Sequence, residues 1–448
     1  MGMFSRRKFL TTAGLSTVGA IALNACTSET PTATTTTPAA TSAATTAATT
    51  AAAPVNAADA PETTKAKLGF IALTDASPLI IALEKGYFKK YGMTDVEVLK
   101  QASWGTTRDN IVLGSDAGGI DGAHILTPMP YLIAEGKITN GNKVPMYILA
   151  RLNTNGQGIS VANNFKDDKI GLKSDVLKET FAKQKAAGKD LKCAMTFPGG
   201  THDLWIRYWL SANGVDPDKD VSTIVVPPAQ MVANMKAGNM EAFCVGEPWN
   251  ARLVAQNSGY SALITGELWK DHPEKAFSLR ADWVDKNPKA AMALLKGVLE
   301  AQVWCEDPAN KEEMCKIVGA DKWLKVPAIE ILGRQQGKVD YGDGRTLDNP
   351  DLSMKFWKDN ASYPFKSHDL WFLTEDIRWG YFDATLDTKA LVDKVNREDL
   401  WKEAAKAIGK EADIPKSTSR GIETFFDGVK FDPENPKAYL DSLKFKKV

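Results

Sequence analysis

The stretch TFPGGTHDLWIRYWL, residues 196–210, places two glycines, a threonine and a histidine directly before an aromatic-rich run. Thr201 can cap a helix that begins here. Gly199 and Gly200 let the backbone come close to a ligand, and His202 then lies in the first helical turn. Free N–H groups and the helix dipole favour an anion at such a position. A capped helix with an incidental histidine explains the same residues, so the rest of the chain must decide.

Further junctions between predicted strands and helices carry hydrogen-bond donors. These junctions are SWGTT with Trp104, NGQG with Gln157, GEPW with Gly246 and HPEK with Lys275. Together with His202 they form a set of donors rather than a catalytic constellation. Some of them also have an ordinary explanation, as a packed indole, a turn residue or a solvated surface lysine.

Motifs for enzyme chemistry are missing from the sequence. It contains no G-x-S-x-G, no G-x-x-x-x-G-K-[ST] and no H-E-x-x-H. The four histidines are widely scattered, at His124, His202, His272 and His368. The sequence therefore gives little support for an enzyme.

The cysteines do not form a metal-binding pattern. None of the four that follow Cys26 belongs to a C-x-x-C pair, and none has a zinc-site spacing to a histidine. Cys193 and Cys244 lie in apolar runs and are expected to be core thiols. Cys305 and Cys315 flank a break at a proline and could be bridged or free.

The N-terminus predicts export and lipidation. Arg6, Arg7 and Lys8 precede a short apolar stretch that is too diluted with Thr, Ser and Gly to span a membrane, which is typical of a cleaved signal. The segment SRRKFL resembles a twin-arginine signal, and LNAC at 23–26 resembles a lipobox. We therefore expect an export signal over 1–25 and a lipid on Cys26.

A tether is predicted between this anchor and the folded part. Residues 27–64 are almost entirely Thr, Ala, Pro and Ser, and such a segment cannot bury enough apolar surface to fold. We assign 26–65 to a lipidated tether whose coil would span about 35 Å. No later stretch is apolar and long enough to cross a membrane.

The overall charge excludes a nucleic-acid-binding surface. The chain has 55 basic and 55 acidic residues, and removal of the signal takes away three bases and no acid. The mature chain then has 52 bases and 55 acids, a net charge of −3. Because this charge produces no global positive field, an anion site must be local.

The globular part alternates strand-like and helix-like segments, which predicts α/β lobes with largely parallel sheets. Ligands in such folds bind where strands end and helices begin. We expect two lobes joined by a hinge, with the chain crossing near residue 155 and returning near 250. The expected parts are 66–155 and 251–335 for lobe 1, 156–250 for lobe 2 and 336–448 for a C-terminal extension.

Long runs of the sequence resemble the nitrate-binding lipoproteins of nitrate/nitrite importers. They include KLGFIALTDASPLIIALEKGYFKKYGM, KQASWGTTRDN, GGIDGAHILTPMPYLI, CVGEPWNARL, DHPEKAF and SRGIETFFDG, besides the opening stretch. The resemblance implies a two-lobed, periplasmic-binding-protein-like clamp with a helical C-terminal extension. It also implies a protein on the periplasmic side of the bacterial inner membrane that is not an enzyme and needs no cofactor or metal. Its partners would be nitrate or nitrite and the permease and ATPase subunits of an ABC importer.

The resemblance also implies a ligand set: Trp104, Gln157, His202, Gly246 and Lys275. Trp104 and Lys275 would belong to one lobe and His202 to the other. Nitrate is never protonated near neutral pH, so the site should offer donors only, with Lys275 balancing the charge of the anion. GGTH would present backbone and imidazole donors.

Two alternatives stay open at this stage. A related group with the same scaffold binds bicarbonate; it lacks the glycine pair and histidine of GGTH and has an acidic residue in place of Lys275. Pyrimidine-synthesising enzymes with a related two-lobed fold are the second alternative, and they would need a lysine that forms an aldimine with pyridoxal phosphate.

Overall fold

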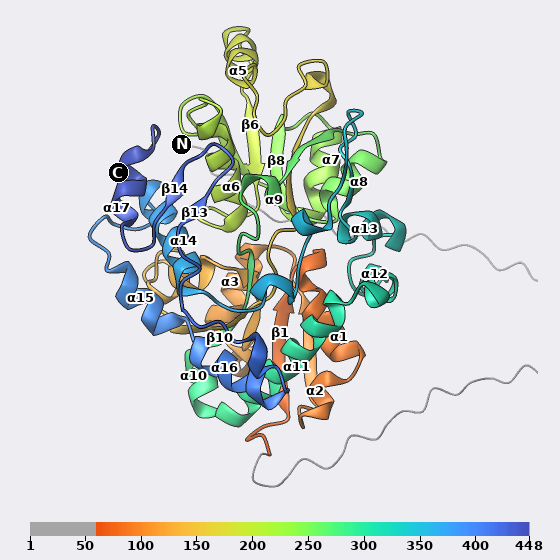
Figure 1. Cartoon of the computed structure of the whole chain (residues 1–448), viewed down its shortest axis with the longest axis vertical. Coiled ribbons are helices and arrows are strands. Elements are labelled where there is room, and N and C mark those ends of the chain that lie inside the picture. The colour runs from red at the N-terminus through yellow and green to blue at the C-terminus, as the bar shows by residue number, and fades with distance from the viewer. Residues whose placement is uncertain (1–59, 448) are drawn as a thin grey trace, which may run out of the picture. The chain divides into compact units, whose positions relative to one another are not determined.

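The computed structural model describes residues 60–447, which fold around two five-stranded sheets. The predicted export signal, the predicted lipidation site Cys26 and most of the predicted tether lie outside the described residues. Figure 1 shows the strands β1 and β10 of one sheet below the strands β6 and β8 of the other, with helices packed around both. The fold is therefore an α/β clamp with two sheets.

The first sheet has four strands in one direction and one reversed strand. Its order is β2-β1-β3-β10-β4, with β1 parallel to β2 and β3 and with β10 antiparallel to β3 and β4. The bounds are β1 Lys65–Phe70, β2 Asp95–Lys100, β3 Gly122–Leu126, β4 Met146–Arg151 and β10 Lys275–Arg280.

The second sheet repeats this pattern. Its order is β7-β6-β8-β5-β9, and the reversed strand is β5, which is antiparallel to β8 and β9. The bounds are β5 Gln157–Val161, β6 Lys192–Met195, β7 Ser222–Val225, β8 Ala242–Gly246 and β9 Tyr260–Ile264. Four of the five strands in each sheet share a direction, so the expectation of largely parallel sheets is confirmed.

The chain crosses between the sheets twice, once after β4 and once after β9. The first crossing, residues 152–156, agrees with the expected position near 155. The second occupies 265–274, because the buried strand β9 still pairs with β5 in the second sheet. The predicted return near 250 is therefore too early in the sequence. The two crossings lie against each other, since Asn155 N–H donates to His272 O at 3.0 Å.

Helices connect the strands and cover the sheets. Their bounds are α1 Ser77–Glu84, α2 Tyr87–Lys90, α3 Trp104–Leu113, α4 Met129–Ala134, α5 Leu177–Ala186, α6 Thr201–Ala212, α7 Met231–Lys236, α8 Trp249–Ala255, α9 Thr265–Leu268, α10 Ala281–Lys286, α11 Pro288–Glu306, α12 Lys311–Gly319 and α13 Ala328–Gln335. Pro78 lies in the first turn of α1, where its missing N–H costs nothing. Helix α6 begins at Thr201, but its N-cap is Gly200, so the predicted capping role of Thr201 is wrong.

The C-terminal part packs back onto the sheets. It contains α14 Lys366–Arg378, α15 Thr388–Val395, α16 Glu398–Ala407 and α17 Pro436–Ser442, with two short hairpins, β11 Lys338–Asp340 with β12 Thr346–Asp348 and β13 Glu423–Thr424 with β14 Lys430–Phe431. Trp371 of α14 stacks on Trp205 of α6 at 4.8 Å between ring centroids. Asp369 of α14 forms a fully buried ion pair with Arg151 of β4 at 2.8 Å. Helix α14 thus contacts β4 of the first sheet and α6, the helix that follows β6 of the second sheet.

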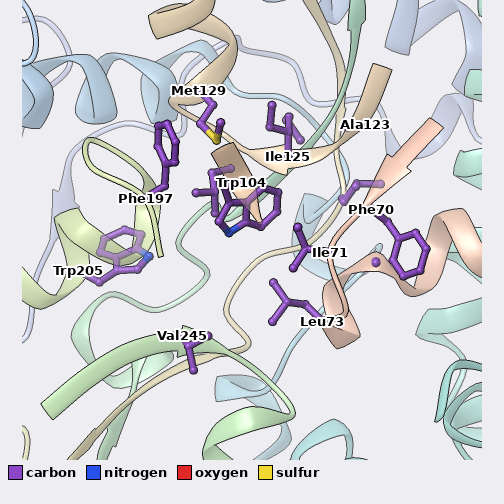
Figure 2. Packing of buried hydrophobic residues seen from close by; sticks show 14 of the residues in the cluster. Phe70, Ile71, Leu73, Trp104, Ala123, Ile125, Met129, Phe197, Trp205 and Val245 are labelled. Atoms are coloured by element: carbon purple, nitrogen blue, oxygen red, sulfur yellow. The ribbon is translucent and has the colours of Figure 1, made fainter. Parts of the chain in front are cut away.

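The hydrophobic core extends continuously between the two sheets. Figure 2 shows Phe70, Ile71, Leu73 and Trp104 on one side and Val245 of β8 on the other. Each of these side chains is almost completely buried. The polar groups that reach the region between the sheets are therefore held in apolar surroundings.

Within residues 60–447 the structure shows the state of the cysteines and can be searched for metal ligands and for membrane-spanning helices. All four cysteines there are buried and free, so Cys305 and Cys315 are not bridged. Among these residues no cluster of His, Cys, Asp and Glu could hold a metal ion. No helix in the same range is both long and apolar enough to span a membrane.

One buried carboxyl group opposes the stability of the fold. Asp376 of α14 is fully buried, and neither of its carboxyl oxygens has a hydrogen-bond partner in the described part of the chain. Burial, together with the nearby carboxylates of Asp203 and Glu375, raises the pKa of Asp376 well above its usual value. The native state therefore favours a protonated Asp376.

We expect Asp376→Asn to raise the melting temperature at pH 7.5 by roughly 2–4 °C. The folded-state pKa lies above the unfolded one, so Asp376 destabilises the fold increasingly as pH rises above about 4. The gain should therefore shrink in thermal melts near pH 4. The exposed Asp383→Asn is the control and should show no gain. A lower melting temperature for Asp376→Asn at both pH values would contradict this.

Candidate functional site

The centre of the site is Lys275, the first residue of β10. It lies directly after the second crossing and opposite Leu126, the last residue of β3. Because β10 is reversed, its beginning meets the carboxyl ends of its neighbours, which is where such folds bind ligands. The side chain is fully buried, and its ammonium contacts Asp75 Oδ2 at 2.9 Å and Glu274 Oε1 at 2.8 Å. Burial lowers the pKa of Lys275, but the two carboxylates outweigh burial and raise it above its usual value. The ammonium is therefore charged.

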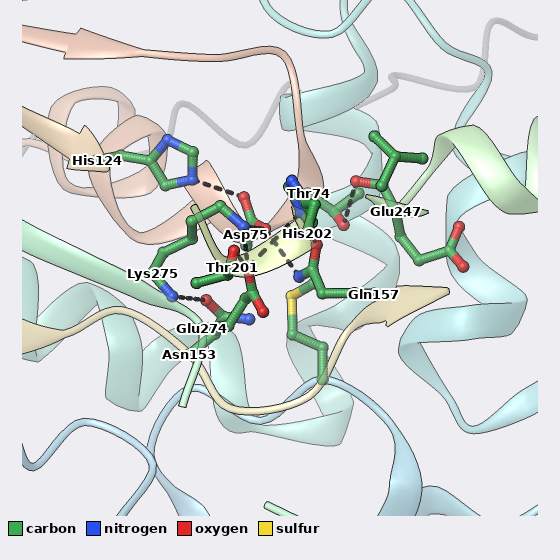
Figure 3. Close-up of polar contacts among 12 residues, drawn as sticks. Thr74, Asp75, His124, Asn153, Gln157, Thr201, His202, Glu247, Glu274 and Lys275 are labelled. Atoms are coloured by element: carbon green, nitrogen blue, oxygen red, sulfur yellow. Dashed lines mark hydrogen bonds and ion pairs between the residues drawn. The ribbon is translucent and has the colours of Figure 1, made fainter. Parts of the chain in front are cut away.

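Asp75 receives donors from both sheets. It lies in a short 3-10 helix, Thr74–Ala76, between β1 and α1. In Figure 3, His124 and Lys275 approach its carboxylate from one side and Gln157 from the other. Asp75 accepts from His124 Nε2 at 2.6 Å and from Gln157 Nε2 at 3.1 Å. Burial alone would raise the pKa of Asp75, but Lys275 and His124 hold it below its usual range.

Glu274 is the second carboxylate at Lys275. It is fully buried and accepts hydrogen bonds from Thr201 Oγ1 and, at 2.7 Å, from Trp205 Nε1, both of helix α6. Burial raises the pKa of Glu274 above its usual value, and the Lys275 ammonium opposes this. Each carboxylate thus accepts three hydrogen bonds, which occupies most of its lone pairs.

A chain of hydrogen bonds runs from α6 to Asp75. Thr196 Oγ1 lies 2.5 Å from His202 Nδ1, and His202 Nε2 lies 2.7 Å from Gln157 Oε1. Because the Gln157 amide donates to Asp75, its oxygen accepts from His202. Burial lowers the pKa of His202 well below its usual value, and Lys275 lowers it further. His202 is therefore a neutral imidazole that donates through Nε2.

Trp104 carries an unused donor beside this network. It is the first residue of α3, which is capped by Ser103, whose hydroxyl accepts from Thr106 N at 3.1 Å. The indole is fully buried, and its Nε1–H has no hydrogen-bond partner within residues 60–447. The Lys275 ammonium is 5.9 Å from the centroid of the indole, and the His124 ring is 5.5 Å from it. Figure 2 shows the indole nitrogen directed toward the strand that carries Val245.

Gly246 leaves the space that the network needs. It is the last residue of β8 and pairs with Gln157, the first residue of β5. A Cβ atom at Gly246 would lie 2.6 Å from Gln157 Oε1 and 3.2 Å from Asp75 Oδ2. A larger residue at this position would therefore displace the amide of Gln157.

The glycine pair before α6 serves packing instead of presenting free N–H groups. Gly199 has φ +69°, and a Cβ atom at Gly200 would lie 2.6 Å from Leu126 Cδ1. Gly199 N–H donates to Asp203 Oδ2 at 3.0 Å, and Gly200 N–H donates to Phe197 O at 3.0 Å. The glycines thus let α6 approach the first sheet, and their own N–H groups are not available to an anion.

The structure brings the five sequence-predicted residues to one place. Lys275 begins β10 of the first sheet, and Trp104 begins α3, the helix after β2 of that sheet. Gln157 and Gly246 lie in β5 and β8 of the second sheet, and His202 lies in α6, the helix after β6. The expectation of a site with donors only does not hold, because two carboxylates flank Lys275.

Sequence reasoning missed three members of the network, namely Asp75, His124 and Glu274. Asp75 follows a strand, as the predicted residues do, so its position alone could have indicated it. Glu274 lies next to Lys275 in HPEK, but a site that binds an anion gives no reason to expect a carboxylate there. His124 is one of four scattered histidines and lies in the middle of β3, so no junction between a strand and a helix points to it.

Direct contacts join the two sheets around the network. Thr74 N–H donates to Glu247 O at 2.8 Å, and Trp249 Nε1 donates to Ala72 O at 2.9 Å. Each bond links the segment after β1 to the segment after β8. These bonds enclose the buried network between the sheets.

A surface groove lies elsewhere on the first sheet. It has a volume of about 1090 Å³ and is lined by Lys65 and Asp95, the first residues of β1 and β2, together with Arg280 and Trp283. These residues mark the edge of the first sheet opposite to Lys275. None of the five predicted residues lines this groove.

Comparison with known proteins gives consistent results. Residues 59–319 match the NMT1-like family. The chain is 64% identical to the nitrate/nitrite binding protein NrtA of Synechocystis, covering 99% of this chain and 98% of the relative. The crystal structure of the periplasmic NrtA from that organism superimposes with a TM-score of 0.84 at 67% identity, covering 86% of this chain and all of the other.

Two further relatives are a bicarbonate-binding protein and an ATP-binding protein for nitrate import. The bicarbonate-binding protein CmpA of Synechococcus elongatus is 46% identical, covering 99% of this chain and 98% of the relative. The nitrate import ATP-binding protein NrtC of Synechocystis is 32% identical, covering 85% of this chain and 55% of that protein. From the matched family and from these full-length identities, we conclude that the chain belongs to the NMT1-like family and is a homologue of the NrtA nitrate/nitrite binding proteins.

Proposed function

We propose that this protein is an extracytoplasmic solute-binding protein that captures nitrate, and also nitrite, between its two sheets and delivers it to an ABC importer. The observation that carries this is the buried indole N–H of Trp104, which has no partner among the described residues and lies beside the buried Lys275 ammonium. The names of the relatives, which are binding and import proteins, support transport rather than catalysis.

The ammonium of Lys275 has a donor left for a ligand. An ammonium carries three N–H donors, and Asp75 and Glu274 take two of them. The third N–H and the Trp104 indole N–H are therefore both free to bind an anion. Because nitrate accepts hydrogen bonds and donates none, these two donors suit it.

The remaining proposed ligands complete this donor set. The amide of Gln157 donates to Asp75 and the Nε2–H of His202 donates to Gln157. These two donors would have to turn from their present partners to nitrate when it binds, while Gly246 leaves room beside them and would offer its backbone N–H. Nitrate has four heavy atoms, so at about −1.5 kcal/mol per atom its binding reaches roughly −6 kcal/mol, a Kd of about 40 μM. Tighter binding would require charge-assisted hydrogen bonds in a site closed to water.

We also propose that the protein acts at the periplasmic side of the inner membrane and is anchored by lipid on Cys26. The lipobox at 23–26 behind a charged n-region supports this. The similarity to an import ATPase supports a partnership with permease and ATPase subunits.

Trp104→Phe tests whether the unpartnered indole N–H of Trp104 meets the ligand, because it keeps an aromatic ring and removes only the N–H and the second ring. A hydrogen bond to a charged group contributes about 1.5–3 kcal/mol, so nitrate binding in calorimetric titration should weaken by roughly tenfold or more. Trp323→Phe is the matched control, since Trp323 is also buried and its indole N–H also lacks a partner in the described chain. Equal affinity for both variants would show that the Trp104 N–H does not meet the ligand.

Lys275→Met should weaken nitrate binding by at least about tenfold, because within residues 60–447 it removes the only cation in contact with the two carboxylates. Breaking a buried ion pair also costs stability, so thermal melts must confirm that the variant is folded. Lys311→Met replaces another buried lysine and should keep nitrate affinity.

Titration with bicarbonate provides the decisive comparison: tighter binding of bicarbonate than of nitrate by the unmodified protein would favour the bicarbonate alternative.

Cys26→Ser should release the protein from membranes into the soluble periplasmic fraction, because no acyl chain can then be attached. Membrane fractionation and immunoblotting measure this directly. A variant that stays membrane-bound with its signal uncleaved would mean that the signal itself is the anchor.

A further inference from the structure

The buried network at Lys275 carries a negative charge of its own. Asp75 and Glu274 supply two carboxylates, and Lys275 supplies the one ammonium that contacts them. All three side chains are fully buried. Burial raises the pKa of Glu274, but all three of its partners donate hydrogen bonds to it, as they do to an ionised carboxylate. With Glu274 ionised and neutral imidazoles at His124, His202 and His272, the network has a net charge of −1.

This charge matters for the proposed function, on which the present inference rests. A monovalent anion placed beside Lys275 would make the net charge of the buried network more negative, from −1 to −2. Like charges repel strongly where water is excluded, so a compensating positive charge favours the complex. Lys275 cannot supply that charge, because it is already protonated.

We propose that the pair formed by Asp75 and His124 takes up one proton when nitrate binds, so that the site binds the anion and a proton together. The proton comes from solvent and bonds to His124 Nδ1, and no bond in the protein is broken. The imidazole becomes an imidazolium beside the Asp75 carboxylate. The network then holds the same net charge of −1 with nitrate as without it.

The geometry selects His124 among the histidines. Its Nε2 donates to Asp75 Oδ1 at 2.6 Å, so a positive charge on the ring would have a carboxylate in direct contact. Its Nδ1 is buried and has no hydrogen-bond partner within residues 60–447, so this nitrogen can accept a proton without losing an existing bond. Both features belong to a strand residue held inside the first sheet.

The other two histidines are less suited. Both ring nitrogens of His202 are engaged, and its nearest carboxylate, Glu274, is 3.6 Å from Nε2. His272 Nδ1 lies 3.0 Å from Pro273 O and Nε2 lies 2.7 Å from Thr265 Oγ1, while Glu274 is 3.8 Å away. Neither imidazolium would have a carboxylate within hydrogen-bond distance.

The charged and titratable groups around His124 give the sign of the effect. Burial lowers the pKa of His124 below its usual value, Asp75 opposes this, and Lys275 of the neighbouring strand lowers it further. The His202 imidazole of α6 is neutral, and the Trp104 ring of α3 does not titrate. His124 is thus neutral near pH 7 in the free protein, and an added anion raises its pKa.

The expected pH dependence follows from linkage. Between the pKa of His124 in the free protein and its higher pKa in the complex, binding of nitrate takes up a proton, and affinity falls as pH rises. Full coupling would change the affinity by about tenfold per pH unit. Nitrate itself does not titrate in this range, so the protein must be the source of any dependence.

Calorimetric titration of the full protein with nitrate, in phosphate and in Tris at the same pH, measures the number of protons taken up. We expect an uptake that is clearly above zero and at most one proton at pH 6.5, and an affinity that falls by roughly tenfold between pH 5.5 and 7.5. Nitrate binding with no proton uptake and constant affinity across this range would overturn the inference. Absence of nitrate binding at every pH would instead overturn the proposed function on which it rests.

His124→Gln locates the proton. A glutamine amide can still donate to Asp75 but cannot titrate, so proton uptake should fall to near zero and the affinity should no longer depend on pH. His368→Gln is the matched control, because His368 is also buried but lies on α14 outside the network, and it should retain the uptake. Unchanged proton uptake in His124→Gln would overturn the assignment to this pair.

Discussion

The ion cluster of Lys275 with Asp75 and Glu274 is the interaction on which the rest of this structure depends. Removing three charged groups from water is costly, and it is tolerated only where each has close partners. Here each carboxylate accepts three hydrogen bonds, and the ammonium contacts both carboxylates. Lys275 begins β10 of the first sheet, Asp75 lies in the short helix that follows β1 of that sheet, and Gln157 begins β5 of the second sheet. The cluster therefore fixes how the two sheets meet.

The reversed strand in each sheet explains how such a cluster can form. A reversed strand begins at the edge where its parallel neighbours end, so its first residue lies at the ligand-binding edge. Lys275 begins β10 and Gln157 begins β5, and each follows a crossing between the sheets. The two crossings lie against each other, and helix α14 contacts elements of both sheets. The site is thus built from the connections between the sheets, with the C-terminal part supporting them from outside.

The sequence was informative where residue type and local pattern coincide. Alternating strands and helices predicted the α/β sheets, and the junction residues Trp104, Gln157, His202 and Lys275 meet at one place. The sequence was less informative where pairing between residues far apart in the chain decides which sheet a strand joins and which side chains meet. Strand β9 belongs to the second sheet because it pairs with β5, which no local pattern shows. Asp75 becomes a partner of Lys275 only through the crossing that brings residue 275 back to the first sheet.

The presence of two carboxylates in an anion site becomes understandable once their hydrogen bonds are counted. They are acceptors already occupied by protein donors, and they keep the Lys275 ammonium charged in a buried place. What remains available is one N–H of the ammonium and the indole N–H of Trp104. A crystal structure of the protein with nitrate tests this account most directly. The account predicts nitrate oxygens within hydrogen-bond distance of Lys275 Nζ and Trp104 Nε1, with Asp75 and Glu274 still bound to the ammonium; nitrate bound elsewhere, with neither donor in contact, would contradict it.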